Sequence, residues 1–164
     1  MENNRIKFIT RTGILLALAL VVQMGGFPQP VTGPLINTIL YLAALLVNGW
    51  SGVIIGVFTP AIAFFRGILP PPLAPIIPFI ALSNAILALI FASAMKKNKI
   101  IAVILASVMK YFVLSAAVGF IVNVPDKIAQ MMSLPQLFTA LIGGGIALIA
   151  FKALEAIGLG KVKK

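Results

Sequence analysis

The sequence predicts an all-α integral membrane protein, a compact bundle of six transmembrane helices that forms a single domain over residues 1–164. Three observations lead to this prediction. The chain is 61% hydrophobic and only 10% charged, which a soluble domain of this length has no means to bury. Its apolar segments approach the length of about 20 residues that a transmembrane helix needs. Basic residues flank these segments at one set of ends, and prolines gather at the other.

The apolar segments predict six spans, at about residues 8–24, 35–48, 52–66, 76–95, 100–122 and 136–157. They are continuously apolar, whereas the strands of a membrane β-barrel alternate apolar and polar residues, so helices are expected. The first span follows a basic stretch as a signal peptide would. No small-residue cleavage site follows it, so we expect a retained helix.

The connections between the spans alternate in character. A tight turn at Gly49-Trp50-Ser51 joins the second span to the third, and the basic segment Lys96-Lys97-Asn98-Lys99 joins the fourth to the fifth. The other three connections, residues 25–34, 67–75 and 123–135, contain most of the prolines. Proline restricts the unfolded chain, so these three loops are expected to be stiff.

Counting basic residues on each side orients the bundle. Cytoplasmic loops of membrane proteins carry an excess of lysine and arginine, so both termini of this multi-pass protein are predicted to be cytoplasmic. The net charge of +10 then reflects anchoring in the lipid bilayer and not nucleic-acid binding. The outer side keeps only Arg66 and Lys127, and the inner side collects Arg5, Lys7, Arg11, Lys96, Lys97, Lys99, Lys152, Lys161, Lys163 and Lys164.

The residue inventory argues against an enzyme. The chain has no cysteine and no histidine, and its only acids are Glu2, Asp126 and Glu155. No metal cluster and no catalytic carboxylate pair can be assembled from these residues. No nucleotide-binding motif is present, because the only Gly-Lys pair lacks the phosphate-loop spacing. We therefore expect no metal, no cofactor and no catalysis, and uphill transport would need energy from another subunit.

Lys110 is the most informative single residue. It lies about ten residues from either end of the predicted span 100–122, about 15 Å from each membrane surface. A lysine at the bilayer centre costs about 2.5–3.5 kcal/mol, and no acid is expected at that depth. An anionic ligand in a water-filled cavity open to the outside would supply the missing charge. The alternatives are a neutral lysine, a lysine bonded to carbonyl groups, and a lysine facing a partner's acid.

Other polar residues accompany Lys110. Asn84 is expected at a similar depth, because a short inner loop makes its span the antiparallel neighbour of the span that carries Lys110. It is predicted either to bind ligand beside the ammonium or to hold helices together. Pro60 frees the carbonyl of Gly56, which marks either a ligand-facing kink or a packing kink. Further polar residues near the outer span ends are candidates for ligand binding: Asn37, Thr139, Arg66, Tyr41, Gln23 and Gln136.

Small residues suggest where another membrane protein docks. Gly13 and Ala17 form a small-xxx-small pair in the first span, and Gly143, Gly144 and Gly145 lie in the last. Small residues let helix backbones approach closely, either within the bundle or against a partner.

With these features in order, the chain resembles a substrate-binding S component of the energy-coupling-factor (ECF) transporters. The resemblance covers nearly the whole chain and is carried by TRTGILLALALVVQ, TGPLINTILYLAALLVNGWSG, LPPPLAPIIPFIALSNAILALIF and PQLFTALIGGGIALI. It implies a subunit of a prokaryotic plasma membrane that captures a vitamin or related micronutrient outside the cell. The partners it implies are a coupling transmembrane subunit and two ATPase subunits. The family often carries an alanine-xxx-alanine docking motif in its first span, where this chain has Gly13 and Ala17.

The resemblance also implies that the outer loops and the fourth to sixth spans hold the substrate, where Lys110, Asn84 and Thr139 fall. A second hypothesis is a structural or assembly membrane protein with no small-molecule ligand. Its polar residues inside the spans would only join helices, and it should tolerate Lys110→Met.

Overall fold

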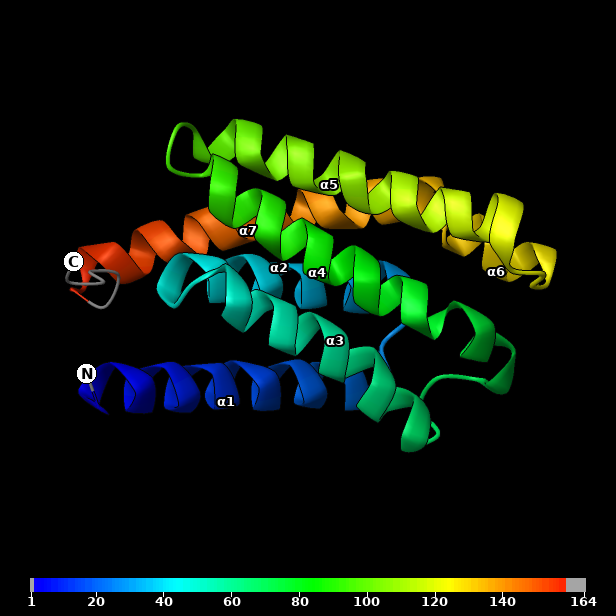
Figure 1. Ribbon diagram of the computed structural model, residues 1–164, viewed down its shortest axis with the longest axis horizontal. Coiled ribbons are helices and arrows are strands. Elements are labelled where there is room, and N and C mark those ends of the chain that lie inside the picture. The colour runs from blue at the N-terminus through cyan, green and yellow to red at the C-terminus, as the bar shows by residue number, and fades with distance from the viewer. Residues whose placement is uncertain (1, 159–164) are drawn as a thin grey trace.

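The computed structural model describes residues 2–158, and these residues contain helices and no strand. Six long helices form the bundle (Figure 1). They are α1 (Glu2–Met24), α2 (Gln29–Leu46), α3 (Gly49–Phe65), α4 (Ile77–Ala94), α5 (Lys99–Ala116) and α7 (Leu134–Ala156). Three short elements complete the described chain: the 3-10 helix η1 (Pro71–Ile76), the π-helical turn η2 (Ala117–Ile121) and the helix α6 (Asp126–Met131).

Five helical segments are long and apolar enough to cross a membrane: Asn4–Met24, Gln29–Leu46, Pro71–Ala94, Lys99–Ile121 and Asp126–Ala156. The remaining helix, α3, has 17 residues. At 1.5 Å per residue it reaches about 26 Å, slightly less than the hydrocarbon core of a typical bilayer. The all-helical architecture with several apolar helices is therefore confirmed, and the count of six spans stays a prediction.

The helix α2 begins earlier than the sequence suggests, at Gln29 and not at residue 35. Prolines led to the expectation of a loop over residues 25–34. However, Pro30 occupies the first turn of α2, where a backbone N–H has no partner within the helix and its loss costs nothing. Part of the expected first outer loop is therefore helical, and the side chains of that turn take fixed directions.

The two ends of the bundle differ in the way the sequence predicts. The described chain begins and ends at one end, where the α2–α3 and α4–α5 turns also lie (Figure 1). The opposite end carries the α1–α2 connection, η1 and α6. Arg5, Lys7 and Arg11 are in the first half of α1, and Lys152 is in the last turns of α7. Lys161, Lys163 and Lys164 lie outside the described residues.

Some helices pack most extensively against their neighbours in the sequence, and others pack against distant helices. The most extensive contacts join α2 to α7, α3 to α4 and α4 to α5, whereas α1 packs on α2 and α3 at the edge of the bundle. Gly143 and Gly144 serve internal packing: a Cβ at Gly143 would lie 2.6 Å from the carbonyl oxygen of Pro34 in α2, and one at Gly144 would lie 2.3 Å from Val103 in α5. Gly145 faces open space.

The distribution of polar side chains is the reverse of that in a soluble protein. Large apolar side chains are exposed on the outside of the bundle, among them Ile14, Phe112 and Ile149 at 63%, 58% and 74%. Polar side chains are buried between the helices, including Asn37, Asn84 and Lys110. Such a surface is stable in lipid and not in water, and buried polar groups then need partners inside the bundle.

Candidate functional site

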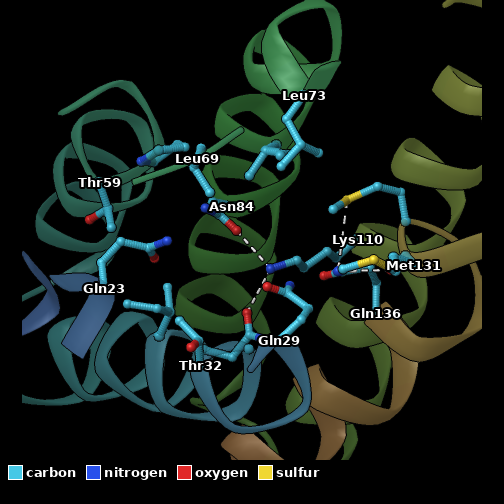
Figure 2. A pocket seen from close by; sticks show the side chains of 16 residues that line it. Gln23, Gln29, Thr32, Thr59, Leu69, Leu73, Asn84, Lys110, Met131 and Gln136 are labelled. Atoms are coloured by element: carbon cyan, nitrogen blue, oxygen red, sulfur yellow. Dashed lines mark hydrogen bonds between the residues drawn. The ribbon is translucent and has the colours of Figure 1, made fainter. Parts of the chain in front are cut away.

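A pocket lies at the end of the bundle that carries η1 and α6. It contains about 640 Å³ of empty space, including the part open to solvent. Its walls come from all the long helices and from the three proline-rich connections. Figure 2 shows Lys110 extending from α5 across this pocket toward Asn84 of α4. The lining residues are Gln23, Gln29, Thr32, Gly33, Ile36, Asn37, Thr59, Pro60, Leu69, Leu73, Ile80, Asn84, Lys110, Met131, Met132 and Gln136.

The ammonium of Lys110 is held by two amide oxygens. Its Nζ donates to Oδ1 of Asn37 on α2 and to Oδ1 of Asn84 on α4, each over 2.7 Å. Figure 2 shows the bond to Asn84. Only 4% of the Lys110 residue surface is exposed. Of the arrangements that the sequence left open, the structure has the lysine bonded to carbonyl-type oxygens. Two of the three ammonium N–H groups are used, and α2, α4 and α5 meet at this nitrogen.

The neighbouring proline fixes the orientation of the Asn84 amide. Pro60 has no backbone N–H, so the carbonyl of Gly56 lacks its usual partner within α3. The Nδ2 of Asn84 donates to this carbonyl over 3.1 Å. A reversed amide would place its oxygen against the Gly56 oxygen and its N–H groups against the ammonium. The Oδ1 of Asn84 is therefore directed at Lys110.

The Thr139 hydroxyl supports the Asn37 amide from the side opposite Lys110. The Nδ2 of Asn37 donates to Oγ1 of Thr139 over 3.5 Å, and Thr139 donates in turn to the carbonyl of Gln136 over 3.1 Å. Gly33 permits this contact, because a Cβ there would lie 3.0 Å from the Thr139 methyl group. Both amides thus present oxygen to the ammonium, and each is supported by a second helix.

The predicted site residues divide into three groups. Five of them line the pocket: Lys110, Asn84, Asn37, Gln23 and Gln136. Thr139 does not line the pocket, but its hydroxyl accepts a hydrogen bond from the Asn37 amide. Tyr41 is also outside the lining: it is fully buried, its hydroxyl pairs with Ser107 over 2.9 Å, and its ring meets Phe91 edge-on at 4.8 Å. Arg66 is exposed at the end of α3 and is not among the lining residues.

The sequence did not single out several lining residues. Thr32 was assigned to a loop and is in the first turns of α2, and Met131 and Met132 close the pocket from the end of α6. Gln136 holds that segment, since its Nε2 donates to the carbonyl of Met131 over 3.1 Å. Thr32, Met131 and Met132 share one sequence signal, which is that each lies in one of the three proline-rich connections. Each of these connections supplies pocket residues.

The charge in the pocket is unbalanced. Among the described residues, none that lines the pocket is acidic. Asp126 and Glu155 are both exposed, at the start of α6 and near the far end of α7. An ammonium with one free N–H, a floor of amides and apolar walls form an arrangement suited to holding a small molecule.

Close packing behind the pocket makes a testable prediction. A Cβ added at Gly56 would lie 2.7 Å from the Cβ of Asn84, so Gly56→Ala should push α3 away from α4. We expect it to destabilise the purified protein by about 1–3 kcal/mol, the usual cost of overpacking. Gly145→Ala is the matched control, since a Cβ there meets open space and alanine favours the helix. Equal melting temperatures for the two variants would contradict the packing described here.

The chain was compared with known proteins. The family model of the ECF transporter substrate-specific component matches residues 7–155. A search of curated proteins found no match. A search of solved structures found no match either. The family match covers almost the entire chain and includes every helix that lines the pocket. This chain therefore belongs to the family of substrate-specific components of ECF transporters.

Proposed function

We propose that this subunit captures a small anionic organic solute, a vitamin or related micronutrient, from outside the cell and delivers it through an ATP-driven partner complex. The observation that carries the proposal is the Lys110 ammonium, held on the pocket floor with no acid beside it among the described residues. A buried charge without a counter-ion is costly, and a bound carboxylate or phosphate would remove that cost.

A ligand-stabilisation screen on the purified protein tests this proposal. Ligands that bind only the folded state raise its melting temperature, by an amount that grows with concentration. We expect stabilisation by one class of anionic micronutrient-like solutes and none by their neutral or cationic analogues. If no small solute stabilises the protein, the second hypothesis, a membrane protein with a structural or assembly role, would replace this one.

The proposed direction of transport requires the pocket to open outward and both termini to be cytoplasmic, with six spans in all. Because cysteine is absent, single cysteines can report the topology. Lys97→Cys, in the exposed α4–α5 turn, should be protected from an impermeant thiol reagent in intact cells. Gln130→Cys, exposed on α6, should be labelled. Lys97 is suitable because it does not cap α5, a role that Asn98 fills. The opposite labelling pattern would overturn the topology.

We also propose that the Gly13/Ala17 face of α1 docks on the coupling transmembrane subunit, which assembles with two ATPase subunits. Both residues are exposed, and a Cβ at Gly13 meets no atom within 4 Å, so this face takes no part in internal packing. Ala17→Trp should reduce transport in cells strongly and leave ligand binding by the isolated subunit unchanged, because only the contact between helix backbones is blocked.

Ile104→Trp is the control for this docking prediction. Ile104 is 48% exposed on α5, on the opposite side of the bundle from α1 (Figure 1). The Ile104→Trp substitution adds a similarly bulky side chain to a lipid-facing helix and should leave transport intact. Full transport by Ala17→Trp, or uphill transport by this subunit reconstituted alone, would show that the proposed docking is wrong.

A further inference from the structure

We infer that the ligand is a monoanionic carboxylate with an aliphatic body and neutral polar groups, and not a phosphate ester, an amino acid or an aromatic acid. This inference rests on the proposed function and specifies the chemistry of the same pocket. It follows from the number of free donors at Lys110, from the charges of the lining residues, and from the kinds of side chain in the walls.

The number of donors limits the charge of the ligand. Asn37 and Asn84 each accept one N–H of the ammonium and are held in that orientation by Thr139 and the Gly56 carbonyl. One N–H remains for the ligand, and no second cation lines the pocket among the described residues. A phosphate monoester carries a charge of about −1.5 to −2 at pH 7, which is more than one ammonium balances. A single charge-assisted hydrogen bond suits one carboxylate.

The lining also disfavours a cationic group on the ligand. None of the described lining residues carries a carboxylate, so an ammonium on the ligand would be buried without a counter-ion and close to the Lys110 ammonium. Like charges that are brought together cost several kcal/mol. Amino acids and other zwitterions are therefore poor candidates, although they carry the carboxylate that the site would accept.

The walls indicate the body of the ligand. Six lining side chains are aliphatic or thioether: Ile36, Leu69, Leu73, Ile80, Met131 and Met132. The chain has 11 phenylalanines, two tyrosines and one tryptophan, yet none of these lines the pocket within the part of the chain that the structure describes. Aromatic ligands gain specificity from stacked or edge-on aromatic side chains, and this pocket offers none.

Neutral polar side chains complete the lining. Gln23, Gln29 and Thr32 stand around the pocket with Asn84 and Lys110 (Figure 2). The Thr32 hydroxyl already donates to the carbonyl of Phe27 over 2.9 Å. The Gln23 and Gln29 amides need a hydrogen-bonding partner when a ligand covers them, and a purely hydrocarbon tail would supply none. The ligand is therefore expected to carry hydroxyl or amide groups along its aliphatic body.

A matched set of probes on the purified full chain tests the inference. The probes are ω-hydroxyhexanoate, its neutral primary amide, the zwitterion ω-aminohexanoate, para-hydroxybenzoate and hexanol monophosphate. We expect ω-hydroxyhexanoate to bind at least about tenfold more tightly than any other probe, the equivalent of about 1.4 kcal/mol. Lys110→Met should remove that preference over the neutral amide, because the two probes differ only at the group that meets the ammonium.

The outcomes separate the inference from the proposed function. Equal or tighter binding of the benzoate, the phosphate or the zwitterion through Lys110 would overturn the inferred ligand class and leave the capture of an anion standing. Tighter binding of the neutral amide than of the carboxylate in this set would overturn both the inferred ligand class and the proposed function. Both would also be overturned if no solute in this set or in the broader screen stabilises the protein.

Discussion

Lys110→Met is expected to weaken binding of the anionic ligand by about 2–3 kcal/mol, which is roughly 30- to 150-fold in Kd. Methionine keeps the length of the side chain and removes the charge. The ligand would lose its charge-assisted hydrogen bond from an ammonium that is almost fully buried. The measurement is the dissociation constant of the solute found in the stabilisation screen, for wild type and variant.

The melting temperature of the ligand-free variant separates a binding role from a structural one. Removing the ammonium relieves its desolvation cost but deprives the Asn37 and Asn84 oxygens of a donor. Both asparagines line an open pocket, where water can replace the lost donor, so the change should be small. Lys96→Met is the control, since Lys96 is an exposed residue of the α4–α5 turn. Unchanged affinity with a clearly lower melting temperature would mean that Lys110 only joins helices.

Asn37→Asp is expected to abolish binding of the same anionic ligand while stabilising the empty protein. The substitution has almost the same shape and places a carboxylate where Oδ1 lies 2.7 Å from the Lys110 nitrogen. The ammonium would then have an internal counter-ion, and the incoming anion would meet a negative charge. Affinity should fall at least about 100-fold, roughly 3 kcal/mol, because like charges brought together cost several kcal/mol.

Position 37 suits this experiment better than position 84. A carboxylate at 37 would have the Thr139 hydroxyl behind it, which can turn its proton toward the new oxygen. A carboxylate at 84 would face the carbonyl oxygen of Gly56 instead. Asn98→Asp is the matched control, because aspartate caps a helix as well as asparagine does and Asn98 is the exposed N-cap of α5. If Asn37→Asp binds the anion as tightly as wild type, the ammonium is not its counter-ion.

The proximity of Lys110 and Asn84 could be predicted from the sequence because distance along the helix axis is nearly a linear function of residue position. Counting residues from the span ends placed Lys110 in mid-membrane. Counting from the basic α4–α5 turn placed Asn84 beside it, and the two side chains are 2.7 Å apart in the structure. The prolines marked the three connections that contribute to the pocket, Pro60 marked the free Gly56 carbonyl, and the ordered motifs indicated the family.

The sequence by itself determined that lipid surrounds a helical bundle, which end of it is basic, and which helix carries the buried charge, since composition and spacing along single helices decide these. Only the tertiary structure decided which polar side chains meet. Tyr41 turns to Ser107, Thr139 supports Asn37, and Arg66 stays outside the lining. The rotation of each helix about its axis is set by packing against its neighbours, such as the close approach at Gly56 and Gly143. That rotation, which no single segment encodes, decides which residues face the pocket.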